Sequence, residues 1–253
     1  MDWELPKFPL GEYIEKGIDF LVTHLAGGTN ALSDMIDNGI TAMTDFLLAY
    51  PAVVMILVFG FIAWWITRKW KLTVFTVIGF GLIWNLNLWQ PTMQTLSLVS
   101  VATFVAIVLG IPLGVLAAIS KTAERIIMPI LDFMQTLPAF VYLIPAIPFF
   151  GLGAASAMFS TVIFSMPPVI RLTALGIQQV PNELVEACDS FGSTRVQRLI
   201  KLELPIAGPS IRAGVNQTIL LALSMVVIAA MIGAKGLGGV VWKAIQRLEP
   251  GMG

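Results

Sequence analysis

Six segments of this chain are apolar and long enough, or nearly so, to cross a bilayer as helices. A spanning helix needs about 20 mostly apolar residues, with a range of about 17–25. The segments cover about 51–67, 72–89, 93–119, 126–150, 155–178 and 206–232. Only 12% of the residues are charged, against about 25% in soluble domains. We therefore expect an all-α, polytopic membrane protein with its transmembrane core over residues 51–232.

The composition argues against several kinds of partner and site. The formal net charge is zero at pH 7, which argues against nucleic acid as a partner. Cys188 and His24 are each the single residue of their type, too few for an intrachain disulfide or a histidine-rich metal site. No basic start followed by an apolar core precedes residue 50, so no cleavable signal peptide is expected. We expect no cofactor or metal in this chain.

Helix-breaking residues lie inside three of the apolar segments. They are Gly110-Ile111-Pro112-Leu113-Gly114 in the third segment, Pro138, Pro145 and Pro148 in the fourth, and Pro167-Pro168 in the fifth. Proline removes a backbone donor and clashes with the preceding turn. Irregular backbone survives at membrane depth only where it is buried in protein or lines a cavity. These segments are therefore expected to line a translocation path, and the alternative for each proline is a kinked helix that only packs.

Basic residues cluster in three loops that alternate along the chain. They are Arg68, Lys69 and Lys71, then Lys121 and Arg125, then Arg195, Arg198, Lys201 and Arg212. Because Lys and Arg favour cytoplasmic loops, these loops are expected in the cytoplasm and the N-terminus outside. Residues 233–253 then form an extracytoplasmic segment, and its basic residues are an exception to the rule.

Residues 1–50 are amphipathic rather than spanning. Apolar residues recur at helical spacing from Leu10 to Leu25 and again from Leu32 to Leu47. Gly27-Gly28-Thr29-Asn30 separates the two runs and predicts a turn. We expect two helices on the outer leaflet or against the spans; a small extracellular domain is the alternative.

A charged island separates the fifth and sixth segments. Asn182 is suited to cap a first helix, and Gly192 follows where a left-handed helix terminus favours glycine. Ser193 or Thr194 can cap a second helix, which Pro205 is expected to end. Such an island at a membrane surface is expected to contact a soluble partner. The alternative is an interfacial amphipathic hairpin without a partner.

The spacing of this island resembles the EAA loop of ABC-importer permeases, written E-A-A-x3-G-x9-I-x-L-P. Cys188 stands where the second Ala is usual, and Leu202 where Ile is usual. The resemblance implies a type I ABC-importer transmembrane domain whose cytoplasmic loop, over 179–205, seats in an ATPase subunit. The residues it implies for coupling are Glu183, Glu186, Ala187, Cys188, Gly192, Leu202, Leu204 and Pro205.

Other stretches resemble glycine betaine/proline-betaine permeases. They are Asp132–Pro145, Met166–Thr173, and Asn216-Gln217-Thr218 with Leu221–Val227, within a similarity over about 50–245. The resemblance implies osmoprotectant uptake across a bacterial plasma membrane by a permease homodimer. It also implies two ATPase subunits, which bind the ATP, and an extracytoplasmic substrate-binding protein. The family usually continues with another span after the region of 233–253, so we expect a fragment or a chain without that helix.

Two ionisable residues lie inside spans, Asp132 and Arg171. A charge at the bilayer centre costs at least about 2.5–3.5 kcal/mol and usually marks a function or a pair. Both lie at similar depth from the cytoplasmic ends, so we expect a contact that supports an inner gate. The alternative is independent snorkelling to the interface. Pro138, Phe140, Tyr142, Pro167 and Pro168 complete the candidates for gate or pathway, with ordinary packing as the alternative for the aromatic residues.

Two other function classes remain open. An ion-coupled secondary transporter of a small zwitterionic solute would normally need acidic or broken-helix groups near mid-membrane, and Asp132 lies near one end of its span. A membrane enzyme would need a catalytic set, a metal cluster or a phosphate-binding loop such as G-x-x-x-x-G-K-[ST], which the sequence lacks. We therefore expect a non-enzymatic permease whose ATP is hydrolysed by a separate subunit.

Overall fold

The computed structural model describes residues 10–249 and 251, and its regular elements there are all helical. They are α1 (Leu10–Leu48), α2 (Ala52–Thr67), α3 (Trp70–Asn85), α4 (Trp89–Ile119), α5 (Lys121–Thr136), the 3-10 helix η1 (Ala139–Tyr142), α6 (Leu143–Phe150), α7 (Ala154–Ser165), α8 (Pro167–Gln178), α9 (Asn182–Ser190), α10 (Arg195–Arg198), the π-helix η2 (Leu199–Glu203), α11 (Leu204–Met231) and α12 (Leu237–Arg247). The expected all-α class is confirmed. The outermost parts of the expected terminal segments, 1–9, 250 and 252–253, lie outside the described residues.

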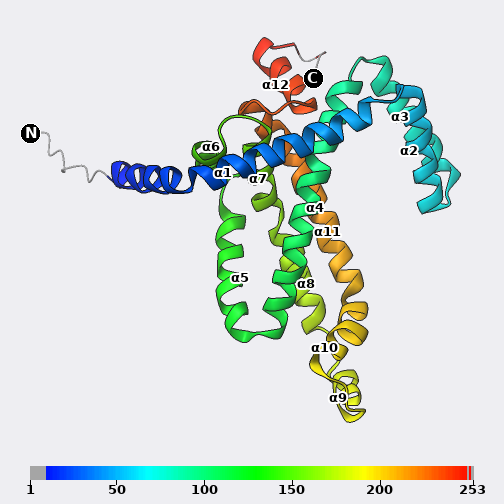
Figure 1. The fold of residues 1–253 in the computed structure, drawn as a ribbon. Helices are drawn as coiled ribbons and strands as arrows, with labels where there is room; N and C mark the ends of the chain where they lie inside the picture. The colour runs from blue at the N-terminus through cyan, green and yellow to red at the C-terminus, as the bar shows by residue number, and fades with distance from the viewer. Residues whose placement is uncertain (1–9, 250, 252–253) are drawn as a thin grey trace, which may run out of the picture.

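The bundle is built on α4, α8 and α11, which run side by side with α8 packed against both neighbours (Figure 1). Alanines dominate its centre, and they have no exposed surface: Ala102 and Ala106 of α4, Ala157 of α7, Ala174 of α8, and Ala222 and Ala229 of α11. Lipid tails are as apolar as leucine, so helices in a bilayer associate through close van der Waals packing, which small side chains permit.

The expected interruption at Gly110–Gly114 is wrong, because α4 runs unbroken from Trp89 to Ile119 through Pro112. The two glycines mark a close helix contact instead. A Cβ at Gly110 would lie 2.4 Å from Val169 Cγ1, and one at Gly114 would lie 2.6 Å from the carbonyl oxygen of Ile170. The absence of side chains at both positions is therefore what lets α8 reach α4.

The expected turn at Gly27–Asn30 is also wrong, since α1 is one helix of 39 residues. It crosses the ends of α4, α6 and α7 at one end of the bundle (Figure 1). The hydroxyl of Thr29 donates to the carbonyl of Leu25 at 3.2 Å, four residues back. A glycine inside a helix costs only about 0.5–1 kcal/mol, and a helix that has already formed gains a backbone bond with each added residue. Two glycines are therefore too weak to end it.

Fewer continuous spans form than the six expected. Among the described residues, three helices are long and apolar enough to cross a membrane, or up to five if each of two bent pairs counts as one span. The segment 126–150 is one such pair, since the axes of α5 and the η1–α6 part differ by 114°. Leu137 has an extended ψ of 137°, as expected of a residue before proline, and this ends α5. The short α2 and α3, of 16 residues each, form a hairpin beside the bundle (Figure 1).

The α4–α8 contact predicts a sharp difference between two glycines. Replacing Gly114 with Ala forces its Cβ against the Ile170 carbonyl, and overpacking of this kind costs about 1–3 kcal/mol. Gly79 in α3 has open space around its Cβ position, so Gly79→Ala should be neutral or stabilise by about 0.4–1 kcal/mol. Thermal unfolding of the detergent-purified protein measures both variants. Equal melting temperatures for the two would contradict the close contact.

Candidate coupling loop and pathway residues

The first helix of the charged island is α9, at the end of the bundle farthest from α12 (Figure 1). Its N-cap is Pro181, so Asn182 is already helical and the expected Asn182 cap is wrong. Pro181 has the non-helical ψ of 132° that a cap position needs, and helical backbone begins at the next residue. Glu183 lies in the first turn, where the helix dipole favours a negative charge.

The surface of α9 is largely uncovered. Glu186 and Ala187 are exposed, and Cys188 is partly buried. Apolar side chains are exposed with them: Phe191 is 90% exposed and Leu184 43%. A loop that presents large apolar side chains beside carboxylates outside the apolar spans has the composition of a binding surface.

Gly192 ends α9, as the sequence predicts. Its φ of 78° is left-handed, a conformation that costs glycine little. The N–H of Gly192 donates to the carbonyl of Asp189 at 2.9 Å, and that of Ser193 to the carbonyl of Cys188 at 3.2 Å. These two bonds form a Schellman motif, so the turn after α9 has one defined geometry.

Thr194, rather than Ser193, caps the second helix. The N–H of Gln197 donates to the hydroxyl of Thr194 at 3.3 Å, and the Gln197 side chain accepts from the N–H of Thr194 at 2.9 Å. This reciprocal capping box starts α10 immediately after the turn, so α9 and α10 are joined by only a few residues.

Pro205 does not end the second helix, so that expectation is wrong. The chain continues from α10 through η2 into α11, where Pro205 occupies one of the first positions. Within η2 the backbone forms wider turns, and the N–H of Leu204 donates to the carbonyl of Leu199. A π-turn absorbs an irregularity inside a helix, which is why a proline is accommodated here. Leu202 and Leu204 are half-buried at this join.

Arg198 ties the two parts of the loop together, which the sequence reading missed. Its Nη1 donates to both carboxylate oxygens of Asp189 at 2.8 and 3.0 Å, and its Nε to Glu203 Oε1 at 2.8 Å. Glu203 is buried, at 7% exposure, and a buried carboxylate needs such a partner. Partial burial disfavours the charged guanidinium, but the hydrogen bonds and charges of Asp189 and Glu203 outweigh this and raise the pKa of Arg198.

The spacing of that pair explains why it is hard to see in sequence. Arg198 and Glu203 are five residues apart, whereas side chains on one face of an α-helix are three or four apart. The π-turn of η2 brings the five-residue spacing into register. In the sequence, the pair is indicated only by a glutamate, Glu203, inside the Leu202–Pro205 motif and by Arg198 five residues before it.

The structure brings Asp132 of α5 and Arg171 of α8 together. Arg171 Nη2 donates to Asp132 Oδ1 at 2.5 Å, and the two side chains are 39% and 64% exposed. A second bond joins the same helices, from Gln178 Nε2 to Glu124 Oε1 at 2.9 Å. The contact exists as expected, and its gate role stays a prediction.

The other pathway candidates divide by exposure. Pro138 and Phe140 are exposed at the break between α5 and η1. Tyr142 is buried, with its hydroxyl donating to the carbonyl of Met134 and its ring 5.7 Å from that of Phe164. Tyr142 therefore packs inside the fold.

Pro167 and Pro168 are buried at the start of α8. Pro167 is among the least exposed side chains of the chain, and α7 and α8 together form one candidate span, Ala154–Gln178. In the described part of the chain the two prolines are thus buried between helices, and their pathway role stays a prediction.

Known proteins with similar sequences are permease proteins of transport systems. The chain is 46% identical to the glycine betaine transport system permease protein OpuAB of Bacillus subtilis, over 98% of this chain and 88% of that protein. It is 48% identical to the glycine betaine/carnitine transport permease protein GbuB of Listeria monocytogenes, over 98% and 89%. With the glycine betaine/proline betaine permease protein ProW of Escherichia coli it shares 46% identity over 96% of this chain and 69% of ProW.

A solved structure and a family profile agree with these relatives. Inward-facing structures of the MetNI methionine ABC transporter match 59% of this chain and 76% of theirs, with a TM-score of 0.55 and 24% identity, which supports the fold alone. Residues 110–252 match the family described as binding-protein-dependent transport system inner membrane component. This match covers more than half of the chain. The chain therefore belongs to the family of inner membrane components of binding-protein-dependent transport systems.

Proposed function

We propose that this chain is the permease subunit of an ATP-driven importer for glycine betaine or a related quaternary-ammonium osmoprotectant. Relatives named for glycine betaine transport cover nearly its full length. The observation that carries the proposal is the α9–α10 loop, which projects beyond the bundle (Figure 1) with the EAA-type spacing on an uncovered surface. ATP is bound and hydrolysed by a partner subunit that engages this loop.

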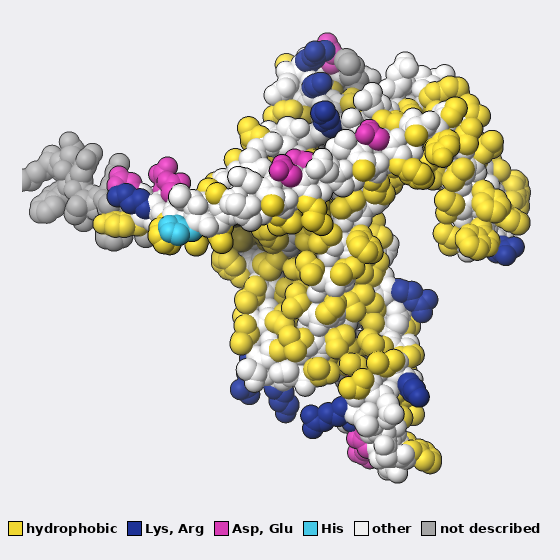
Figure 2. Space-filling model, in the orientation of Figure 1, with side chains coloured by type: hydrophobic (Ala, Val, Ile, Leu, Met, Phe, Trp, Pro, Cys, Tyr) yellow, Lys and Arg dark blue, Asp and Glu magenta, His cyan; other side chains and the backbone are white. Residues whose placement is uncertain are grey.

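The distribution of charge supports an orientation. Figure 2 shows Lys and Arg side chains around the α9 end of the bundle, and at the other end Asp and Glu side chains along α1 with a few basic side chains over α12. Because basic residues favour the cytoplasmic side, the loop faces the cytoplasm, and α1, α6 and α12 lie at the outer face. A substrate-binding protein delivers the solute to that outer face, and two copies of the chain form the path across the bacterial plasma membrane.

The local geometry supports a mechanism for coupling. Pro181, the Schellman motif at Gly192 and the Thr194 capping box fix the shape of the loop. Arg198 connects α9 to Glu203 at the base of α11. A displacement of α9 by the ATPase is therefore passed to a spanning helix instead of being lost in a flexible connection.

ATP-dependent uptake tests the function directly. Vesicles that contain the permease, its ATPase and its binding protein should accumulate radiolabelled glycine betaine only when ATP is supplied. Gly192→Val should reduce uptake strongly, since a β-branched residue at a φ of 78° is strained by about 1–3 kcal/mol. Gly81→Val in α3, where a side chain meets open space, is the matched control.

Two outcomes would contradict this function. Sodium- or proton-driven uptake by the purified chain alone, without the ATPase, would identify a secondary transporter. Labelling that places the α9–α10 loop on the outer face would remove the ATPase coupling.

The ion pairs of Arg198 with Asp189 and Glu203 predict that stability and ATPase coupling can be changed independently. Arg198→Met leaves the buried Glu203 carboxylate unpaired, and breaking such a pair costs about 3–5 kcal/mol. The double variant Arg198→Met with Glu203→Met should recover the melting temperature but not the amount of betaine imported per ATP, because α9 remains disconnected. Lys71→Met, at an exposed residue of α3 outside the α9–α10 loop, should leave both unchanged. Full recovery of coupling in the double variant would refute the role of Arg198 in connecting α9 to α11.

The Asp132–Arg171 pair predicts rescue by exchange of charges. Asp132→Arg and Arg171→Asp should each reduce uptake, because each places like charges together between α5 and α8. Melting temperatures of the two single variants establish that each still folds. The exchanged double variant should regain uptake; if it stays as inactive as the single variants, the two residues act independently.

A further inference from the structure

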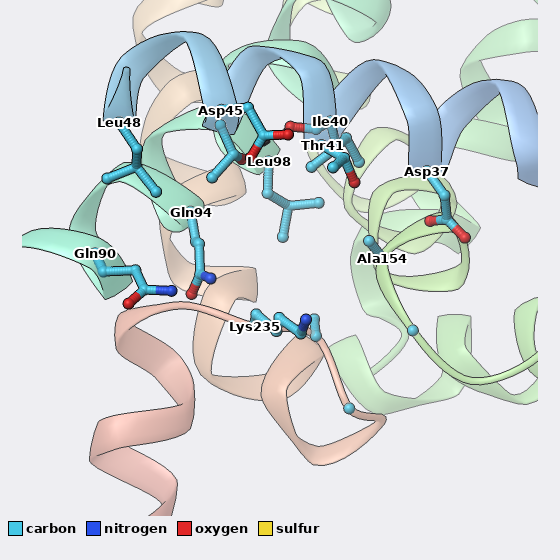
Figure 3. A pocket seen from close by; sticks show the side chains of 14 residues that line it. Asp37, Ile40, Thr41, Asp45, Leu48, Gln90, Gln94, Leu98, Ala154 and Lys235 are labelled. Atoms are coloured by element: carbon cyan, nitrogen blue, oxygen red, sulfur yellow. Dashed lines mark hydrogen bonds between the residues drawn. The ribbon is translucent and has the colours of Figure 1, made fainter. Parts of the chain in front are cut away.

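A chamber of about 490 Å³ opens at the end of the bundle that carries α1. One wall is α1, and the others are the start of α4, the α6–α7 connection and the connection between α11 and α12. Figure 3 shows Asp37 and Asp45 on α1 along one side and Lys235 on the α11–α12 connection across from them. Gln90 and Gln94 of α4 add amide groups. Ligand pockets for small molecules typically have volumes of about 300–1,000 Å³.

Hydrogen bonds hold the two opposing walls in place. Ser33 of α1 donates to the carbonyl of Phe150, at the end of α6, at 3.3 Å. On the other wall, the N–H of Leu237 donates to Thr95 Oγ1 of α4 at 2.8 Å. Gly236 has a φ of 134°, and a Cβ there would lie 2.5 Å from the same Thr95 oxygen. The segment that carries Lys235 is thus held in a defined position against α4.

Among residues 10–249, the charged side chains around the chamber form no ion pair. Asp37 Oδ1 is buried and accepts no hydrogen bond from the described residues. The ion pairs found within residues 10–249 involve neither Asp45 nor Lys235. A buried polar atom without a hydrogen bond is costly, and each such atom in a folded protein calls for an explanation. A cationic group in the chamber would offset the negative charge of Asp37 and Asp45, and an anionic group would offset the positive charge of Lys235.

We propose that this chamber binds a small zwitterion, with its cationic nitrogen at Asp37 and Asp45 and its anionic group at Lys235. The proposal rests on the proposed function, because a betaine is a zwitterion of this kind and the chamber lies at the expected outer face. Gln90 and Gln94 provide further donors for the anionic end. The side chains that line the chamber include no aromatic residue. Recognition there depends on charge instead of a cation–π cage, which suits a site that a solute passes through.

Two sources carry this chemistry, a solute in transit and the headgroup of a zwitterionic lipid. The first measurement uses the permease–ATPase complex, without its binding protein, in nanodiscs of phosphatidylglycerol, which has no zwitterionic headgroup. Radiolabelled glycine betaine should bind saturably. Asp37→Asn removes a negative charge facing the quaternary ammonium, which has no N–H to donate, and Lys235→Gln removes a charged donor to the ligand carboxylate. Each should weaken binding by about tenfold or more.

Matched controls lie just outside the chamber. Asp34→Asn on α1 and Lys243→Gln on α12 change an exposed charge of the same sign nearby without touching the lining, so binding should stay within about twofold. Binding that is absent in the wild-type complex, or equal in the chamber and control variants, overturns the proposal. Melting temperatures confirm that each variant is folded.

Nanodiscs of phosphatidylethanolamine identify the source. Loss of betaine binding in this lipid shows that its headgroup occupies the chamber, and unchanged binding shows a solute site. Uptake in vesicles is measured in parallel to keep the two proposals apart. If the wild-type complex imports betaine and the chamber variants bind and import betaine normally, only the proposal of a binding site in the chamber is overturned. A complex that binds the zwitterion but imports no betaine overturns the proposed function alone.

Discussion

The architecture depends on how closely α8 approaches α4 and α11. Lipid gives no hydrophobic drive for helices to associate, so contact must come from the fit of small side chains. Gly110 and Gly114 remove the atoms that would separate α4 from α8, and Gly214 does the same for α11, where a Cβ would lie 3.0 Å from the Cα of Val169. The resulting three-helix unit is the rigid frame to which the less regular parts attach.

The irregular parts of the chain gather at the two ends of this frame. At one end, the α9–α10 loop is fixed by local capping and by one arginine between two carboxylates. At the other, α1, α6 and α12 pack across the ends of the long helices. Irregular backbone is tolerated where protein or a water-filled cavity satisfies its polar groups, and both ends supply such partners.

Local features such as a helix terminus are predicted well from the sequence. Features that depend on the surrounding helices or on contacts between distant residues are predicted poorly. The Gly192 terminus follows from one residue's tolerance of positive φ, and the Asp132–Arg171 contact from matched depth in neighbouring spans. Helix breakers mislead because their effect depends on context. Pro138 ends α5, yet Pro112 lies inside α4 and Pro205 begins α11 after a π-turn. The Arg198–Glu203 pair and the outer chamber depend on a π-turn and on residues almost 200 positions apart, which spacing rules do not encode.

One helix joins the two candidate sites. The 28 residues of α11 extend about 42 Å at the helical rise of 1.5 Å per residue. They begin beside Glu203 at the Arg198 tie and end just before the connection that carries Lys235. A tilt of α11 large enough to break the hydrogen bond from Leu237 to Thr95 of α4 would move Lys235 relative to Asp37 and Asp45 on α1. A zwitterion bridging those walls would then bind with an affinity that depends on the state of the ATPase. By linkage, its presence would bias that state by the same free energy.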